Sequence, residues 1–190
     1  MQSINFSKYA KIGSIAISIV LLLLGTWLLI EPSIIWKFKN LCAITFFAFG
    51  LVKLLGYASK DLYQLAFQYD FEIGLLLCLI GILVGLHSSK DLTILYVAFG
   101  ICVVVDSLFK MRISYDAKEF GIPTWWITIV LSCGCAILGI VLTFRPILQS
   151  ISMIRLLGVS FLLEGFTNLQ TMITMVKIYK AKPSNQINNV

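Results

Sequence analysis

The stretch IGSIAISIVLLLLGTWLLI, residues 12–30, decides the fold because it carries no charged side chain along its whole length. A helix of about 20 apolar residues spans the hydrocarbon core of a bilayer. The run is continuous and lacks the strict alternation of a barrel strand, so it predicts a helix. It is too long for the apolar part of a signal peptide, and no small-residue cleavage motif follows it. We therefore expect an uncleaved first membrane span.

Five further stretches of the same kind follow along the chain. The six predicted spans are 12–30, 38–57, 71–87, 92–109, 124–144 and 151–176, and a polar cytoplasmic tail is expected over 177–190. Backbone groups in lipid must pair internally, and a bundle of helices meets that requirement. The sequence therefore predicts a single all-α integral membrane domain over 1–190, with six transmembrane helices in contact with the lipid bilayer.

The composition agrees with a membrane protein and excludes other classes. Of the 190 residues, 59% are apolar and 13% are charged, whereas a soluble domain is about half apolar and about a quarter charged. The 15 Lys and Arg residues are scattered between apolar runs and form no basic stripe with interleaved aromatics, so we expect no nucleic-acid partner. The sequence leaves open whether a homo-oligomer forms or another membrane protein binds.

The positive charges of the loops predict the orientation of the spans. One side, with the termini and the loops near 58–70 and 110–123, carries nine: Lys8, Lys11, Lys60, Lys110, Arg112, Lys118, Lys177, Lys180 and Lys182. The other side carries five: Lys37, Lys39, Lys90, Arg145 and Arg155. An excess of positive loops marks the cytoplasmic face. We therefore expect both termini in the cytoplasm. The segments 58–70 and 113–121 mix apolar and charged residues, so we expect short amphipathic turns there at the inner interface.

An internal repeat relates the spans to one another. The odd-numbered spans carry LGTWLLIEP (24–32), IGILVGLHSS (80–89) and LGIVLTFRP (138–146). The even-numbered spans carry FGLVKLLG (49–56), FGICVVVDS (99–107) and LGVSFLLEG (157–165). Repeats at a fixed period indicate one supersecondary unit used several times. The sequence therefore predicts three repeated helical hairpins.

These segments resemble the HdeD family of bacterial acid-resistance membrane proteins, over roughly residues 10–180. The resemblance implies a six-span inner-membrane protein, which in some members is linked to survival of acid. It brings no catalytic motif. The chain departs from a regular repeat at Ser88, where the other hairpins have proline, and at Gly56, where the other two have an acid.

Small residues predict where the helices pack closely. Lipid tails compete equally for apolar side chains, so small side chains are what let two membrane helices approach. The candidate packing residues are Gly25, Gly74, Gly81, Gly85 and Gly139, all in odd-numbered spans. We therefore expect the odd-numbered helices to form the centre of the bundle.

Ionisable residues inside a membrane are costly and mark candidate functional positions. Glu164 lies near the middle of span six, and Ser160 and Asn168 share its helix face. Lys53, in span two, sits three residues earlier in the repeat, which is about 4.5 Å along the axis. We therefore predict an ion pair between Lys53 and Glu164. The alternative is a protonated Glu164 that is hydrogen-bonded or lines water.

Two further polar positions complete the set of candidates. Asp106 lies four residues before Lys110, a spacing that favours an ion pair on one helix. In the outer turns, Glu31 and His87 occupy equivalent repeat positions, and histidine titrates near pH 6.5. Both are candidates for an external response to pH, and the alternative for His87 is a solvated helix cap.

The sequence carries no Ser-His-Asp set, P-loop, zinc signature or dinucleotide motif, so we expect no catalytic residue, no cofactor and no metal. The resemblance to the HdeD family therefore implies a non-enzymatic membrane protein of HdeD-like type in acid or general stress tolerance. The alternative is a small transporter or channel component that uses the polar stripe around Glu164. A solute-flux assay in liposomes separates the two.

Overall fold

The computed structural model describes residues 2–58, 70–86, 93–144 and 151–181, and within these ranges it contains six α-helices and no strand. The helices are α1 (Gln2–Ile30), α2 (Ile35–Ala58), α4 (Asp70–Leu86), α5 (Thr93–Glu119), α6 (Trp125–Phe144) and α7 (Ile151–Ala181). A short 3-10 helix, η1 (Pro32–Ile34), joins α1 to α2.

The apolar lengths of these helices confirm an all-α membrane fold. Five of the described helices, α1, α2, α5, α6 and α7, are long and apolar enough to cross a membrane. The sixth, α4, is apolar over Phe71–Leu86. At 1.5 Å per residue that segment is about 24 Å long, less than the hydrocarbon core of about 30 Å. The chain is therefore a multi-pass membrane protein, and among its described helices α4 is short for a membrane span.

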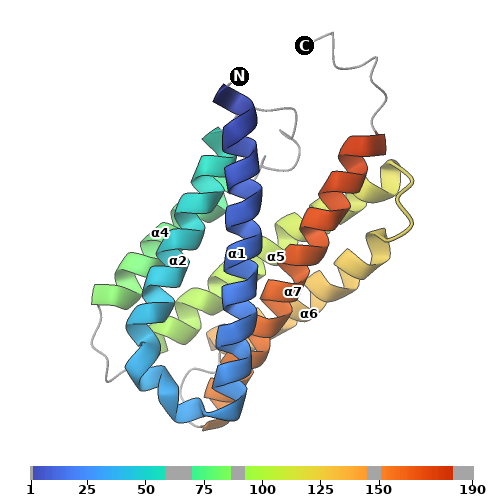
Figure 1. Ribbon diagram of the computed structural model, residues 1–190. Helices are drawn as coiled ribbons and strands as arrows, with labels where there is room; N and C mark the ends of the chain where they lie inside the picture. The colour runs from blue at the N-terminus through green and yellow to red at the C-terminus, as the bar shows by residue number, and fades with distance from the viewer. Residues whose placement is uncertain (1, 59–69, 87–92, 145–150, 182–190) are drawn as a thin grey trace.

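The helices alternate in direction, as Figure 1 shows, so that α1 begins and α7 ends at the same end of the bundle. We call this end, which holds Gln2 and Ala181, the terminal end. The opposite end, where η1 joins α1 to α2, is the turn end. Because α2, α5 and α7 all run toward the terminal end, equivalent residues of these three helices come to similar heights.

The closest helix pairs are not the two helices of each predicted hairpin. The extensive contacts are α1 with α7, α2 with α4, and α5 with α6, whereas α1–α2, α4–α5 and α6–α7 touch less. Each close pair joins the second helix of one hairpin to the first helix of the next. The last hairpin pairs with the first in the same way, so the three hairpins close into a ring.

Each close pair is built on two glycines that face each other. The three pairs are Gly25–Gly158, Gly50–Gly74 and Gly100–Gly139. A Cβ atom on Gly100 would lie 2.7 Å from the carbonyl oxygen of Gly139, and one on Gly25 would lie 2.8 Å from that of Gly158. These distances are too short for any side chain, so the backbones are in direct contact.

The α2–α4 pair is out of register with the other two. By the repeat, Gly81 would face Gly50, but a Cβ atom on Gly81 would meet Ala43 and Phe47 instead. Gly74, seven residues earlier, faces Gly50, so the contact is shifted by two helical turns, or about 10 Å. Gly85 is not needed for close approach, because a Cβ atom there would meet only the Ala43 Cβ, at 3.7 Å.

The centre of the bundle is formed by the even-numbered spans, so the prediction of a centre made by the odd-numbered helices is wrong. Phe46 of α2, Phe99 of α5 and Phe161 of α7 pack together, with ring centroids 4.6 to 5.9 Å apart. We call these three rings the phenylalanine cluster. In the span of α6 only 28% of the residues are buried, against 50% in α5 and in α7. The glycine faces are used within the pairs, and bulky side chains fill the space where the pairs meet.

The prediction of an amphipathic turn over 113–121 is also wrong, because α5 continues as a helix to Glu119. Ile113, Ala117 and Ile122 form a small buried cluster against Trp125 and its neighbours. The helix ends where Gly121 adopts a φ of 69°, which lets the Ile122 N–H donate to the Ala117 carbonyl at 3.0 Å. Nearly all of the other predicted turn, 58–70, lies outside the described residues.

Candidate functional site

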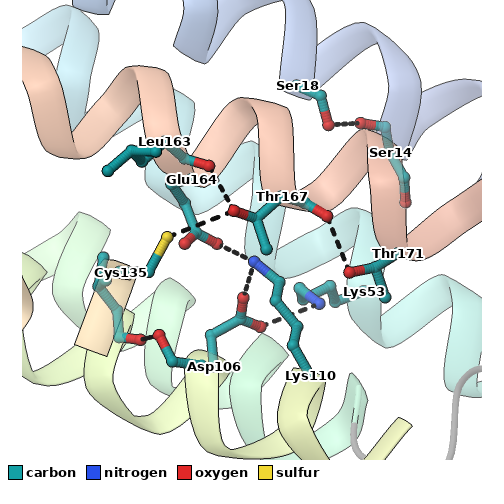
Figure 2. A network of polar contacts seen from close by, with 12 residues as sticks. Ser14, Ser18, Lys53, Asp106, Lys110, Cys135, Leu163, Glu164, Thr167 and Thr171 are labelled. Atoms are coloured by element: carbon teal, nitrogen blue, oxygen red, sulfur yellow. Dashed lines mark hydrogen bonds and ion pairs between the residues drawn. The ribbon is translucent and has the colours of Figure 1, made fainter. Parts of the chain in front are cut away.

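Four ionisable side chains meet inside the bundle, and Figure 2 shows them from close by. Lys110 of α5 lies between two carboxylates: it contacts Asp106 Oδ2, and its Nζ is 2.5 Å from Glu164 Oε1 of α7. Lys53 of α2 places its Nζ 3.5 Å from Asp106 Oδ1. We call these four residues the charge cluster.

The charge cluster is buried and balanced. The side chains of Asp106, Lys110 and Glu164 are 4 to 5% exposed, and that of Lys53 is 11% exposed. Two ammonium groups and two carboxylates give a formal charge of zero. An uncompensated charge in such a place costs several kcal/mol, so the mutual pairing is what allows four charges to be buried together.

The repeat explains why these side chains meet. Asp106 and Glu164 each lie six residues after the glycine of their even-numbered span, Gly100 and Gly158. Because α5 and α7 run in the same direction and contact each other, the two carboxylates lie at the same height. Lys110 follows Asp106 by one helical turn and so shares its face.

The predicted partner of Glu164 is wrong. The cation beside Glu164 is Lys110, and Lys53 contacts Asp106 instead. Lys110 is expected in a loop because its charge ends the apolar run of span four. The spacing of four residues from Asp106 is the signal that places Lys110 on the same helix face, one residue past the predicted end of the span.

Small polar side chains continue from the charge cluster toward the terminal end, between α5, α6 and α7. We call them the hydroxyl seam; its members, all buried, are Ser114, Thr128, Ser132, Cys135, Thr167, Thr171 and Thr174. Thr128 and Thr174 bring their hydroxyl oxygens to 3.3 Å, and Cys135 Sγ is 3.3 Å from Thr167 Oγ1. The sequence predicts a polar stripe around Glu164 on one face of α7, and Thr167 and Thr171 of the seam belong to that stripe.

Ser160 and Asn168, which the sequence places on the same face as Glu164, are buried too, whereas Ser152 and Arg155 of the predicted stripe are exposed. Ser160 donates its hydroxyl proton to the Leu156 carbonyl of its own helix at 2.9 Å. Asn168 is 7% exposed, and its Nδ2 has no hydrogen-bond partner among the described residues. Glu164 Oε2 and Ser132 Oγ are also buried and have no hydrogen-bond partner among the described residues. Buried polar atoms are normally hydrogen-bonded, so these three mark places for ordered water.

On the turn-end side, the charge cluster borders a small cavity. Apart from Asp106 and Glu164, the side chains that line it are apolar or a thiol: Leu21, Phe46, Phe49, Ile73, Leu77, Phe99, Cys102 and Val103. The cavity has room for about one water molecule. In this arrangement it does not admit a larger solute.

The candidates of the outer turns do not join this site. Glu31 is exposed at the turn end, where its Oε1 is 3.5 Å from the Ser33 hydroxyl. His87 lies outside the described residues. Within the ranges that the structure describes, no three His, Cys, Asp or Glu side chains are grouped so that they could hold a metal ion.

A comparison of the chain with curated proteins and with solved structures finds no match. A family model does match residues 130–182, which span most of α6 and all of α7. This segment therefore includes Glu164 of the charge cluster and five residues of the hydroxyl seam: Ser132, Cys135, Thr167, Thr171 and Thr174. Over its last hairpin, the chain is similar to the family described as a short repeat of unknown function (DUF308).

Proposed function

We propose that this chain is a non-enzymatic inner-membrane protein of HdeD-like type that acts in acid or general stress tolerance, with both termini in the cytoplasm. The family match over 130–182 supports a short membrane repeat. The related segments at 24–32 and 80–89 extend that repeat to the other two hairpins. The HdeD-like role is expected from the resemblance of these segments to the HdeD family.

The observation that favours this role over transport is the closed state of the charge cluster. Lys110 pairs with both carboxylates, and the neighbouring cavity has room for about one water molecule. A site for a small-molecule substrate is usually a larger concave pocket with a few convergent polar groups. The geometry therefore supports a protein whose buried charges act on its own helices rather than on a bound solute.

A gene-deletion experiment tests the stress role. We expect a bacterial strain that lacks the chain to survive acid challenge at high cell density less well than its parent, and the intact gene to restore survival. The variant Lys110→Met should fail to restore it, whereas Arg112→Met, at an exposed position of the same helix, should restore it. Equal survival of the deletion strain and its parent would contradict the proposal.

A small transporter or channel component is the second candidate, and one observation favours it. Glu164 and the hydroxyl seam face the interior of the bundle rather than lipid. Under the first proposal, liposomes that contain the purified chain should show no more solute flux than empty liposomes. A flux that Glu164→Gln abolishes would favour the transporter instead.

A further inference from the structure

We propose that Glu164 is a proton-binding site that exchanges protons with one side of the membrane only, through the hydroxyl seam that leads to the terminal end. The phenylalanine cluster closes the other side. This inference goes beyond the stress role and does not rest on it, because it concerns only which compartment reaches the buried carboxylate.

The two oxygens of the Glu164 carboxylate differ. Oε1 is 2.5 Å from the Lys110 ammonium, whereas Oε2 is buried and has no hydrogen-bond partner among the described residues. A buried acceptor without a donor is costly to the folded state. A proton added to Oε2 makes the carboxylate a neutral acid that can donate to a water molecule in the adjoining cavity.

The groups around Glu164 determine what proton binding does. From α5 it is faced by Asp106, Lys110 and Cys102, from α2 by Lys53, and from α6 by Cys135. On α1 and α4 the side chains that line the adjoining cavity are apolar. Proton binding changes the formal charge of the cluster from zero to plus one.

With Glu164 neutral, Asp106 is the one carboxylate left in the charge cluster for two ammonium groups. Lys110 holds it in direct contact, and Lys53 is farther away, at 3.5 Å. Lys53 is also the most exposed of the four side chains, and a lysine near a helix end can extend toward water. Proton binding should therefore loosen the contact between α2 and α5.

The hydroxyl seam provides the route. From Glu164 to Thr174 it extends over about three helical turns, or about 15 Å. Thr167, Thr171 and Thr174 donate their hydroxyl protons to carbonyls of their own helix, so each oxygen still has a lone pair free to accept from water. Water molecules at Ser132 Oγ and Asn168 Nδ2 would satisfy both atoms and connect the hydroxyls into one chain.

The opposite side offers no comparable route. The rings of Phe99 and Phe161 are 4.6 Å apart at their centroids, and Phe46 stacks on Phe99 at 5.4 Å. Leu21, Ile73 and Leu77 border the same cavity and are buried. An apolar contact of this kind excludes water, and protons move through hydrogen-bonded chains. The same carboxylate is thus open to one compartment and closed to the other.

Infrared spectroscopy of the purified chain in liposomes tests the site. On acidification, we expect the absorption band of a protonated carboxyl group to appear, and to shift when the medium is deuterated. The band should be absent from Glu164→Gln and retained at a shifted frequency in Glu164→Asp, which keeps a carboxyl group if the first variant does not fold. No band, or a band that persists unchanged in Glu164→Gln, would overturn the proposal.

Isosteric variants test the route. After a rapid pH change, Thr167→Val and Thr174→Val should each slow the appearance of the band about tenfold, the effect of losing one ordinary hydrogen bond. Thr45→Val is the matched control: Thr45 is buried on α2, outside the seam, and bonds its own helix at Leu41. Unchanged rates in both seam variants would overturn the route.

Vesicles of uniform orientation test the sidedness. A pH change applied to the side of the terminal end should produce the band, and the same change applied to the other side should not. A band that follows the pH of the turn-end side, or of both sides equally, would overturn the one-sided site even if Glu164 binds the proton.

Discussion

Lys110 links two helices, because its one ammonium group contacts a carboxylate of α5 and a carboxylate of α7. It contacts Asp106 on its own helix and lies 2.5 Å from Glu164 on α7. The side chain is only 4% exposed, so water does not take the place of either contact. The pairing therefore ties α5 to α7 at the height where the three even-numbered spans meet.

Replacing Lys110 should destabilise the fold strongly. Lys110→Met leaves two buried carboxylates with Lys53 as the other cation of the cluster, and breaking a buried ion pair costs about 3–5 kcal/mol. Arg112→Met is the control, because Arg112 is 61% exposed and pairs with Asp116 at the surface. Arg112→Met should change the free energy of unfolding by no more than about 0.5 kcal/mol. Thermal unfolding in detergent measures both, and equal shifts would contradict the assigned role of Lys110.

A double-mutant cycle identifies the partner of Glu164. In the background of Glu164→Gln, Lys110→Met should lower the free energy of unfolding less than it does in the parent protein. The difference, which is the coupling energy, should be about 0.5–3 kcal/mol. Lys53→Met should combine with Glu164→Gln more nearly additively, since Lys53 contacts Asp106. Unfolding midpoints of the single and double variants give both couplings. A larger coupling for Lys53 would restore the pairing expected from the repeat alone.

The sequence identified three of the four charged residues as intramembrane positions and paired Asp106 with Lys110 correctly, but it gave Glu164 the wrong partner. Glu164 and Asp106 stand out because an acid inside an apolar run is rare. Lys110 was missed because a lysine at the edge of an apolar run looks the same whether it enters a loop or turns inward. Only the burial of the following turns of α5, around Ile113 and Ala117, decides which of the two occurs.

At the scale of helices, the close pairs depend on backbone contact between glycines. Between α5 and α6, Gly100 and Gly139 each face the carbonyl oxygen of the other. Neither oxygen can move without breaking helical hydrogen bonds, so the contact cannot adapt to a larger residue. The pairs are therefore rigid compared with the surfaces that face lipid.

A methyl group at such a contact should separate the helices. The Cβ of Gly100→Ala would lie 2.5 Å from Thr143 Oγ1 and 2.7 Å from the Gly139 carbonyl oxygen. We expect the free energy of unfolding to fall by about 1–3 kcal/mol because of overpacking. In Gly134→Ala, on α6, the new Cβ would have no neighbour within 4 Å. That control should be neutral or stabilise the helix by up to about 1 kcal/mol. Equal melting temperatures for the two variants would contradict the close α5–α6 contact.

The existence and direction of the helices could be predicted because uninterrupted apolar runs have one solution in a membrane. Their pairing could not, because apolar side chains that face lipid and those that face protein are the same in type. Glycines occur in both helices of every hairpin, so the repeat does not say which two meet. Gly74 and Gly81 lie on one face of α4, and only the structure shows that Gly74 faces Gly50.

At the scale of the whole molecule, three close pairs surround one aromatic centre, and the start of α1 and the end of α7 lie at the terminal end (Figure 1). The charge cluster and the phenylalanine cluster lie one above the other along this centre. The interior of the bundle is therefore polar in its terminal half and apolar in its turn half.

The orientation of the bundle is testable with reporter fusions. Lys110 is buried, so eight rather than nine positive residues count for the side of the termini, against five for the other side. We still expect both termini in the cytoplasm. A reporter that is active only in the cytoplasm should be active at the C-terminus and inactive when fused after Leu86. An external C-terminus would contradict this orientation and would reverse the compartment to which Glu164 is open.

The pairing of α1 with α7 has a consequence for synthesis. Gly25 enters the membrane early, but its partner Gly158 belongs to α7, which leaves the ribosome after the other described helices. Until α7 enters the membrane, lipid or the insertion machinery must occupy the glycine face of α1. During that time Lys110 can pair with Asp106 but not with Glu164. A nascent chain that stops before α7 thus exposes both an unfilled helix face and an unbalanced charge, which are the features that membrane quality-control proteases can recognise. Insertion of α7 completes the close packing and the charge balance in one step.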